Sequence, residues 1–249
     1  MNKTEILQKC TVDGNIIRLP EGQLDRKLYQ EVAKALELIG GKWVGRKTIG
    51  FVFLNDPTEL LEQIANGESR NLKKEFQFFA TPDDVSDWIV KQFAFVELHD
   101  KVLEPSAGQG SIIKAIQRFI PEINVDYCEL MDVNRTFLSK IPNTTFLQDD
   151  FLTLTGKENY YDLIVANPPF SKNQDIDHIR KMYDCLNPNG RGRLISIASA
   201  HWQLSNNKKE TEFRNWLDEV EAEIYNFPKG TFKESGTMVS SVLIVIDKD

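Results

Sequence analysis

The fold of this chain is most constrained by a regular alternation of short apolar runs and amphipathic segments that begins at Lys101. Runs typical of strands lie at 101–104, 124–129, 145–147, 162–166 and 193–199, and helical patterns lie at 111–119, 132–139, 175–186 and 210–217. Such alternation predicts an α/β fold, with a mostly parallel sheet covered by helices on both faces. Two further strands, at 222–227 and 239–246, have no helix between them and predict an antiparallel hairpin at one edge.

The first 75 residues follow a different pattern. Residues 1–22 are predicted to be a loose leader with one short strand, and they precede a helix at 23–39, a hairpin at 42–53 and a helix from Asp56. This pattern predicts a small α+β appendage, helix–hairpin–helix, at residues 1–75 and a larger domain at 76–249. The hairpin carries Lys42, Arg46 and Lys47, which could contact the phosphates of DNA or could simply be solvated.

Composition limits the classes of function. The net charge of −7 is uneven, because residues 1–75 hold 12 basic and 11 acidic residues whereas the remainder holds 18 and 26. An acidic chain is not a general nucleic-acid coat, although a local basic cleft is compatible with this total.

The cysteines Cys10, Cys128 and Cys185 match neither a disulfide framework nor a metal-ligand spacing. No secretory leader and no apolar run of membrane-spanning length is evident, so we expect a cytoplasmic protein without membrane contact.

A ligand site is predicted where the first strand of the large sheet ends. The loop Glu104–Gly110 contains two glycines, which let a backbone approach a ligand closely at the carboxyl edge of an open α/β sheet. Glu129 ends the second strand 19 residues after Gly110, where an acidic residue can bind a pair of ribose hydroxyls. Ile113 replaces the third glycine of the dinucleotide fingerprint, and Glu104 suits a cationic ligand with an ammonium group better than a phosphate.

Two other segments extend this site. The third strand ends at Asp150-Phe151, where a carboxylate can accept a hydrogen bond from an adenine amine and a ring can pack on the base. Thr81-Pro82-Asp83-Asp84 has the residues of a helix start, which predicts Thr81 as the N-cap and Pro82 at the first helical position.

The tetrapeptide Asn167-Pro168-Pro169-Phe170 ends another buried strand. Two prolines lack N–H donors and cannot continue a strand, so the chain must stop there in a rigid conformation. The Asn167 side-chain oxygen and the Pro168 carbonyl are acceptors, and a ring follows them directly. This pattern suits a planar group with an NH2, such as a nucleobase, although Asn-Pro and Pro-Pro are also ordinary turn dipeptides.

These segments, in this order, resemble the S-adenosylmethionine-dependent N6-adenine DNA methyltransferases over about residues 76–247. Phe79-Ala80-Thr81-Pro82 resembles the family segment that cradles the methionine part of the cofactor, and Asn167–Phe170 resembles the catalytic tetrapeptide. The cofactor segment precedes the catalytic one, as in the gamma arrangement. The resemblance implies a Rossmann-like, mostly parallel seven-stranded methyltransferase sheet with an antiparallel edge hairpin.

The resemblance also implies roles for individual residues. Asn167, Pro168, Pro169 and Phe170 would be catalytic, and Phe170 and Phe232 would stack on a flipped adenine. No metal is implied, and DNA is the implied partner, which suggests a restriction-modification context. The implied contacts to S-adenosylmethionine, whose product is S-adenosylhomocysteine, are Phe79, Thr81, Glu104, Pro105, Ala107, Gly108, Gly110, Glu129, Asp150, Phe151 and Asn167.

Other functions stay open at this stage. Asn-Pro-Pro-Phe also occurs in methyltransferases of rRNA or tRNA bases and of a protein glutamine, since the planar-amine argument is the same for all of them. A non-catalytic protein that binds DNA or the cofactor, or a nucleotide-binding oxidoreductase, would be a different class. About 80 residues follow Asn167, too few for a large target-recognition domain, so specificity must come from loops, from residues 1–75 or from a partner.

Overall fold

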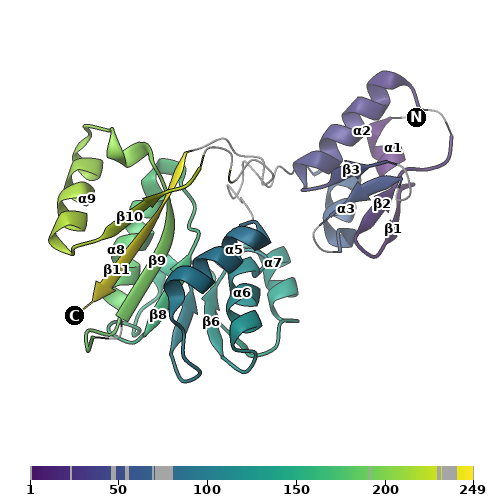
Figure 1. The fold of residues 1–249 in the computed structure, drawn as a ribbon. Coiled ribbons are helices and arrows are strands. Elements are labelled where there is room, and N and C mark those ends of the chain that lie inside the picture. The colour runs from purple at the N-terminus through teal and green to yellow at the C-terminus, as the bar shows by residue number, and fades with distance from the viewer. Residues whose placement is uncertain are drawn as a thin grey trace. The chain divides into compact units, whose positions relative to one another are not determined.

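The computed structural model describes residues 2–22, 24–45, 49–53, 56–68, 70, 81–190, 192–228, 231 and 240–248. The chain divides into two compact units, Met1–Phe78 and Phe79–Asp249. Each unit is described by itself (Figure 1). Among the described residues, no helix is long and apolar enough to cross a membrane.

The smaller unit is an antiparallel sheet with helices packed on it. Its described elements are α1 (Lys3–Leu7), β1 (Thr11–Asp13), β2 (Ile16–Arg18), α2 (Arg26–Leu38), β3 (Lys42–Val44), β4 (Gly50–Val52) and α3 (Thr58–Ala65). The four strands described there run in the order β1-β2-β4-β3. Asp25 caps α2 by accepting hydrogen bonds from the N–H groups of Lys27 and Leu28.

The prediction of a loose leader over residues 1–22 is wrong, because this stretch contains α1 and the β1–β2 hairpin. The sequence does hold the signals for both. Asn2 and Glu5 form a reciprocal capping box at the start of α1. Gly14 takes a φ of +60° in the turn between β1 and β2, a conformation that glycine adopts without steric cost.

The larger unit alternates strands with helices, as predicted. Its regular elements are α5 (Asp83–Ile89), β5 (Val102–Glu104), α6 (Ser111–Phe119), β6 (Val125–Cys128), α7 (Asp132–Leu138), β7 (Thr144–Gln148), β8 (Leu163–Ala166), α8 (Gln174–Cys185), β9 (Gly192–Ser199), α9 (Lys208–Glu219), β10 (Glu223–Asn226) and β11 (Ser241–Lys248). Short helical turns are η1 (Val90–Ala94), η2 (Phe151–Thr153), η3 (Ser171–Asn173) and η4 (His201–Gln203).

The strands of this unit confirm the predicted sheet. Within the described ranges, seven strands pair in the order β10-β11-β9-β8-β5-β6-β7. The strands from β9 to β7 are parallel neighbours, whereas β11 pairs antiparallel with both β9 and β10. Figure 1 shows β10 and β11 at one side of the sheet and the α5–α7 helices around the other. The chain thus has a Rossmann-like sheet with an antiparallel edge.

Both faces of the sheet are buried, which explains why its central strands read as continuous apolar runs. In β8, Leu163 and Val165 belong to the core beneath α5 and α6, and Ile164 and Ala166 belong to the core beneath α8 and α9. All four are at most 1% exposed. A parallel strand covered on both faces needs apolar residues at successive positions, and β8 supplies them.

Helix α5 begins differently from the prediction. Its first residue is Asp83 and its N-cap is Pro82, with no side-chain capping bond. Thr81 therefore does not cap the helix, although the local sequence is favourable for it. Its hydroxyl instead accepts a hydrogen bond from a residue far along the chain, as described below.

Candidate active site at the carboxyl edge of the sheet

The predicted site residues come together because they follow neighbouring parallel strands. Strand β5 lies between β8 and β6, and β7 lies beyond β6. The glycine loop after β5 is therefore flanked by the tetrapeptide after β8 and by Glu129 after β6. Parallel strands end at the same edge, and this is where open α/β sheets bind ligands.

The glycine loop is held to the neighbouring strand by direct bonds. Gly108 donates its N–H to Glu129 Oε2 over 2.7 Å, and Ala107 donates its N–H to the Cys128 carbonyl over 3.0 Å. Gly108 and Gly110 have φ values of +54° and +78°, which glycine accommodates without strain. Pro105 and Ala107 are buried in this loop. The loop thus has a defined backbone conformation beside the Glu129 carboxylate.

Glu129 is buried at the end of β6 and accepts several hydrogen bonds. Besides Gly108, the Met131 N–H and the Asn134 side-chain amide donate to its Oε1, over 2.9 and 3.1 Å. Burial raises the pKa of the Glu129 carboxyl group, and these donors oppose the rise. Asn134, which is 1% exposed, was not predicted; its position five residues after Glu129, in the helix that follows, is the signal that could have identified it.

Glu104 is buried at the end of β5. It is 2% exposed and accepts the Ile113 N–H, in the first turn of α6, over 3.1 Å. Burial raises the pKa of Glu104 well above its ordinary value, and the nearby Glu129 adds to the rise, while the Ile113 N–H and Lys114 oppose it. A positive group placed beside this pair would favour its charged form.

The glycine loop also contains a buried acceptor without a partner. The side-chain oxygen of Gln109 is buried and accepts no hydrogen bond from the described residues. Together with Glu104 and Glu129 it makes an acceptor-rich set at a ligand-binding edge. These groups fit a ligand that carries a cation and several N–H or O–H donors, and they fit a phosphate poorly.

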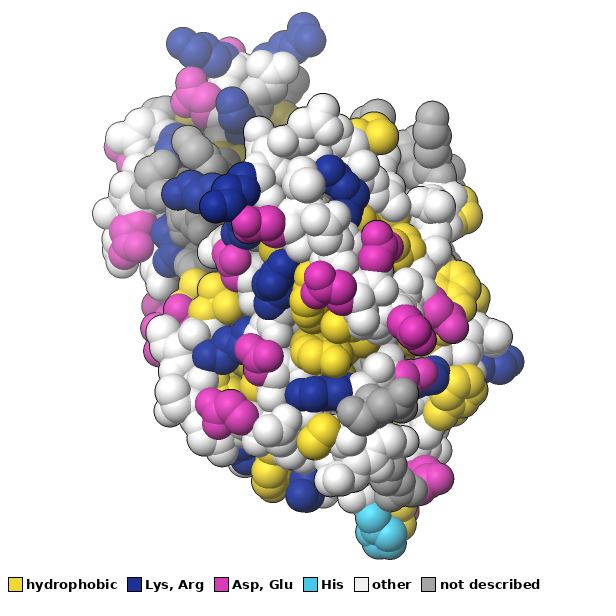
Figure 2. Space-filling view, turned by 90° about the vertical axis from the view of Figure 1, so that its left-hand side faces the viewer, with side chains coloured by type: hydrophobic (Ala, Val, Ile, Leu, Met, Phe, Trp, Pro, Cys, Tyr) yellow, Lys and Arg dark blue, Asp and Glu magenta, His cyan; other side chains and the backbone are white. Residues whose placement is uncertain are grey.

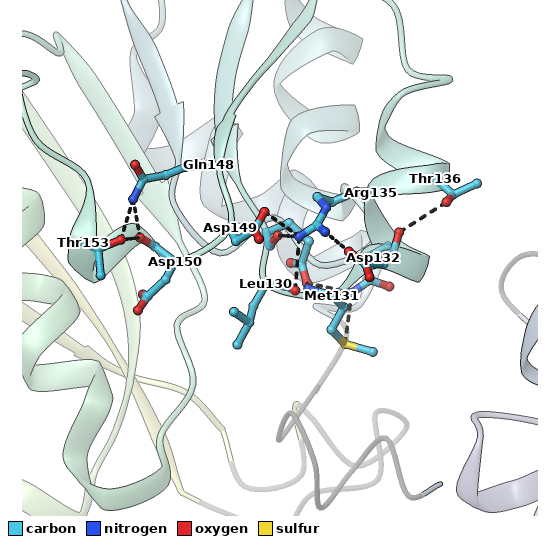
Figure 3. Close-up of polar contacts among 11 residues, drawn as sticks. Leu130, Met131, Asp132, Arg135, Thr136, Gln148, Asp149, Asp150 and Thr153 are labelled. Carbon is cyan, nitrogen blue, oxygen red and sulfur yellow. Dashed lines mark hydrogen bonds and ion pairs between the residues drawn. The ribbon is translucent and has the colours of Figure 1, made fainter. Parts of the chain in front are cut away.

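Arg135 ties the loops after β6 and β7 together. Figure 3 shows its guanidinium reaching from α7 to the backbone after β6 and to the end of β7. It donates to the carbonyls of Glu129 and Leu130 over 2.9 and 3.2 Å, and it pairs with Asp149 over 2.7 Å. A further ion pair joins it to Asp132. Arg135 was not predicted as part of the site, although the opposite charges of Arg135 and the nearby Asp132 are visible in the sequence.

Asp150 and Phe151 lie in different surroundings, since Asp150 is at the edge of the sheet and Phe151 is in the hydrophobic core. The Asp150 carboxylate accepts the Leu152 N–H over 2.9 Å and caps the turn η2. Phe151 is 1% exposed, with its ring 5.7 Å from the ring of His178. The structure therefore corrects the expectation that this ring packs on a bound adenine: it presents almost no surface, because α8 covers it.

The tetrapeptide follows β8 as expected, and its first residue meets Thr81. Asn167 donates from Nδ2 to Thr81 Oγ1 over 3.0 Å, across 86 positions of sequence. This bond fixes the rotation of the amide and so the direction in which its oxygen accepts. Pro168 is buried, and Pro169 and Phe170 are half-buried. Phe170 packs on the core beneath α5 and α6 while part of its ring stays accessible.

The segment after Phe170 is held by the start of α9. Lys172 and Asn173 both have positive φ values, +53° and +58°, which are uncommon for residues with side chains. The Asn173 amide donates to the buried Glu210 carboxylate over 3.0 Å, and Lys209 donates to the Asn173 carbonyl over 2.9 Å. These two α9 residues were not predicted, since nothing local marks them.

Phe79 and Phe232, predicted for cofactor and base contact, lie outside the described residues. Among the residues that are described, no group of three or more His, Cys, Asp or Glu side chains could hold a metal ion.

Comparisons with known proteins agree with this architecture. No family model matches the chain. A stretch of 110 residues is 29% identical to the type II methyltransferase M.AccI of Acinetobacter calcoaceticus, and it spans 43% of this chain and 20% of that relative. The methyltransferase subunit of a type I restriction-modification system from Streptococcus thermophilus superposes with a TM-score of 0.58 at 17% identity, over 69% of this chain and 45% of that one. The predicted resemblance to DNA methyltransferases is confirmed, and the larger unit has a Rossmann-like methyltransferase fold.

Proposed function

We propose that this protein transfers a methyl group from S-adenosylmethionine to the N6 amine of an adenine flipped out of DNA. The observation that carries the proposal is the hydrogen bond between Thr81 and Asn167, at the edge that also holds Glu104 and Glu129. The Asn167 amide, oriented for a substrate amine, then lies at the same edge as a cradle of acceptors formed by Glu104, Gln109 and Glu129. Such a cradle suits a cationic methyl donor. The similarity to M.AccI, a type II methyltransferase, supports the same reaction class.

The residues of the tetrapeptide would position the target amine. Asn167 Oδ1 and the Pro168 carbonyl accept hydrogen bonds from the two N6–H groups, which draws the nitrogen lone pair out of conjugation with the ring. Phe170, joined by Phe232, stacks on the base, and such a stack contributes about 1–3 kcal/mol. Flipping costs a few kcal/mol, so stacking offsets much of it. Catalysis here is positioning plus electrostatics, without a covalent enzyme intermediate.

The cofactor would occupy the cradle after β5, β6 and β7. When bound, S-adenosylmethionine supplies a sulfonium methyl group and leaves as S-adenosylhomocysteine. In this chain the Glu129 carboxylate would accept from ribose hydroxyls, and Asp150 would accept from the adenine amine of the cofactor. Glu104 and Gln109 Oε1 would face its ammonium group. Phe79 and Thr81 would complete the methionine end.

DNA contact would depend on the loops at this edge. Figure 2 shows the side that carries α9, where Lys or Arg side chains alternate with Asp or Glu around a central band of hydrophobic side chains. Among the described residues of this face no broad positive patch is visible. This face would attract DNA through a few local cations and not through a broad positive patch.

Radiolabelled methyl transfer to purified DNA, RNA and protein tests the proposal. We expect transfer to DNA, with the label recovered as N6-methyladenine after digestion to nucleosides. Asn167→Ala should still bind the cofactor, as measured by calorimetry, and should lose methyl transfer. Asn226→Ala, in the exposed edge strand β10, should retain methyl transfer. Label in RNA or in a glutamine side chain, with none in DNA, would replace the proposal with one of the alternatives.

A further inference from the structure

The loop between β9 and α9 carries the most exposed large hydrophobic side chain among the described residues. Leu204 is 89% exposed, whereas the other exposed hydrophobics lie between 37% and 70%. It follows the turn η4, at the carboxyl end of a strand that neighbours β8. Leu204 is therefore displayed at the same edge of the sheet as the tetrapeptide.

This leucine is displayed by a firmly held loop. Arg214, from α9, donates to the carbonyls of Trp202 and Ser205, on both sides of Leu204, the latter over 2.6 Å. Trp202 is 2% exposed and packs edge-to-face on Phe213, with ring centroids 5.2 Å apart. The Leu204 N–H bonds the His201 carbonyl over 3.3 Å. The loop therefore presents its leucine in a defined position, so ordering it for binding costs little entropy.

The same loop is coupled to the catalytic segment through one buried carboxylate. Glu210, 1% exposed, accepts from Ser205 Oγ over 3.1 Å and from Asn173 Nδ2 over 3.0 Å, both on Oε1. Ser205 follows Leu204, and the Asn173 N–H bonds the Phe170 carbonyl over 3.2 Å. One oxygen thus links the leucine loop to the segment that begins with the base-stacking ring.

The loop that carries Leu204 holds cationic and amide side chains in its own sequence. Residues 200–209 contain two lysines, one histidine and no acidic residue, in a chain whose net charge is −7. Lys208 is exposed with 88% of its side-chain surface accessible, and Lys172 is exposed in the neighbouring loop. Lys208 and Lys209 also pair with Glu212 and Asp177, over 3.7 and 2.7 Å, so these cations are partly balanced by acidic neighbours. An apolar tip flanked by cations and amides suits the interior of a DNA base stack, whose outside is lined by phosphates.

From these contacts we infer that Leu204 enters the DNA duplex beside the target site and fills the space that the flipped adenine vacates. The inference rests on the proposed function and adds to it the side chain that holds the duplex open. Apolar wedges of this kind separate neighbouring bases, and the filled gap keeps the extruded base from returning. Leu204 touches the DNA stack and no reacting atom.

The test compares two duplexes that differ only opposite the target adenine. One pairs it with thymine, and the other has an abasic site there, so that the adenine is already unpaired. With the paired duplex we expect Leu204→Ala to lower the rate of methyl transfer about 10-fold, and with the abasic duplex less than about twofold, because flipping an unpaired base costs least. Leu204→Met should keep most of the paired-duplex rate. Leu98→Ala, at a leucine 47% exposed before β5, is the matched control and should equal wild type on both.

A 2-aminopurine at the target position gives a second readout that needs no turnover. Its fluorescence should rise when the wild-type protein binds the paired duplex, and less so with Leu204→Ala. Equal rates for Leu204→Ala and wild type on the paired duplex, or equal losses on both duplexes, would overturn the wedge while leaving methylation intact. A wild-type protein that methylates no DNA would overturn the proposed function first.

Discussion

The hydrogen bond from Asn167 to Thr81 gives the sharpest prediction. Thr81→Val keeps the shape of the side chain and removes the hydroxyl that accepts from Asn167 Nδ2 at 3.0 Å. Thr81 is 7% exposed, so water has little access to replace the lost acceptor. An unsatisfied donor of this kind costs about 1–3 kcal/mol. Because Asn167 is itself half-buried, we expect a value near the lower end.

The lost hydrogen bond should affect the rate of methyl transfer more than the binding of the cofactor. The bond sets the direction of the Asn167 oxygen, which matters most when the substrate amine is being positioned for transfer. A loss of about 1.4 kcal/mol at that stage lowers kcat about 10-fold. The affinity for S-adenosylmethionine should fall by a smaller factor than kcat, since Thr81 would supply only one of several contacts at the methionine end of the cofactor. Single-turnover methyl transfer and calorimetry measure the two quantities separately.

Two companion variants guard against a general loss of structure. Thr81→Ser retains a hydroxyl and should recover most of the rate. Ser86→Ala removes a hydroxyl of the same helix that donates to the Pro82 carbonyl over 3.1 Å, away from the tetrapeptide, and should leave kcat unchanged. A Thr81→Val protein with wild-type kcat, or a Thr81→Ser protein as slow as Thr81→Val, would refute the positioning argument.

Three further predictions concern the cradle. The raised pKa of Glu104 means that its contribution to stability is complete below its ordinary pKa of 4.5 and is lost as pH rises through the folded-state pKa. Glu104→Gln should therefore be more stable than wild type in urea denaturation at neutral pH, and it should bind S-adenosylmethionine more weakly. A difference in stability between variant and wild type that is the same at pH 4 and pH 7 would contradict this. Gly110→Ala places a Cβ 2.6 Å from Ile141 Cδ1 at a φ of +78°, so it should lower stability by about 1–3 kcal/mol, seen as a reduced midpoint in thermal melting. Arg135→Ala removes the side chain that joins the loops after β6 and β7. The variant should bind the cofactor more than tenfold more weakly by calorimetry. An unchanged affinity would show that Glu129 does not need Arg135 to hold its position.

Much of the fold could be predicted because its signals are local or periodic. The four apolar residues of β8 are buried on both faces, so burial dictates the pattern that the sequence displays. The contact between Gly108 and Glu129 could be anticipated too, since each follows one of two adjacent strands. A strand end fixes the position of the next residue, and parallel order then brings such residues together.

Other features depend on partners that are distant in sequence. Thr81 before Pro82 has the local signature of an N-cap, but the tertiary bond to Asn167 competes successfully for its hydroxyl. Phe151 could be read as a ligand contact or as core, and only the packing of α8 decides for the core. Glu210 lies in an ordinary helix start, and its link to Asn173 emerges only when α9 is placed beside the tetrapeptide loop.

The most direct test of the account is the modified-base content of DNA from a methylation-free host that expresses this protein. Nucleoside mass spectrometry should find N6-methyladenine in DNA from cells with the wild-type chain and none in DNA from cells with Asn167→Ala. Sequencing that detects modified adenines should then place the mark at a recurrent site. DNA without N6-methyladenine, from cells that contain folded protein able to bind S-adenosylmethionine, would contradict the central claim.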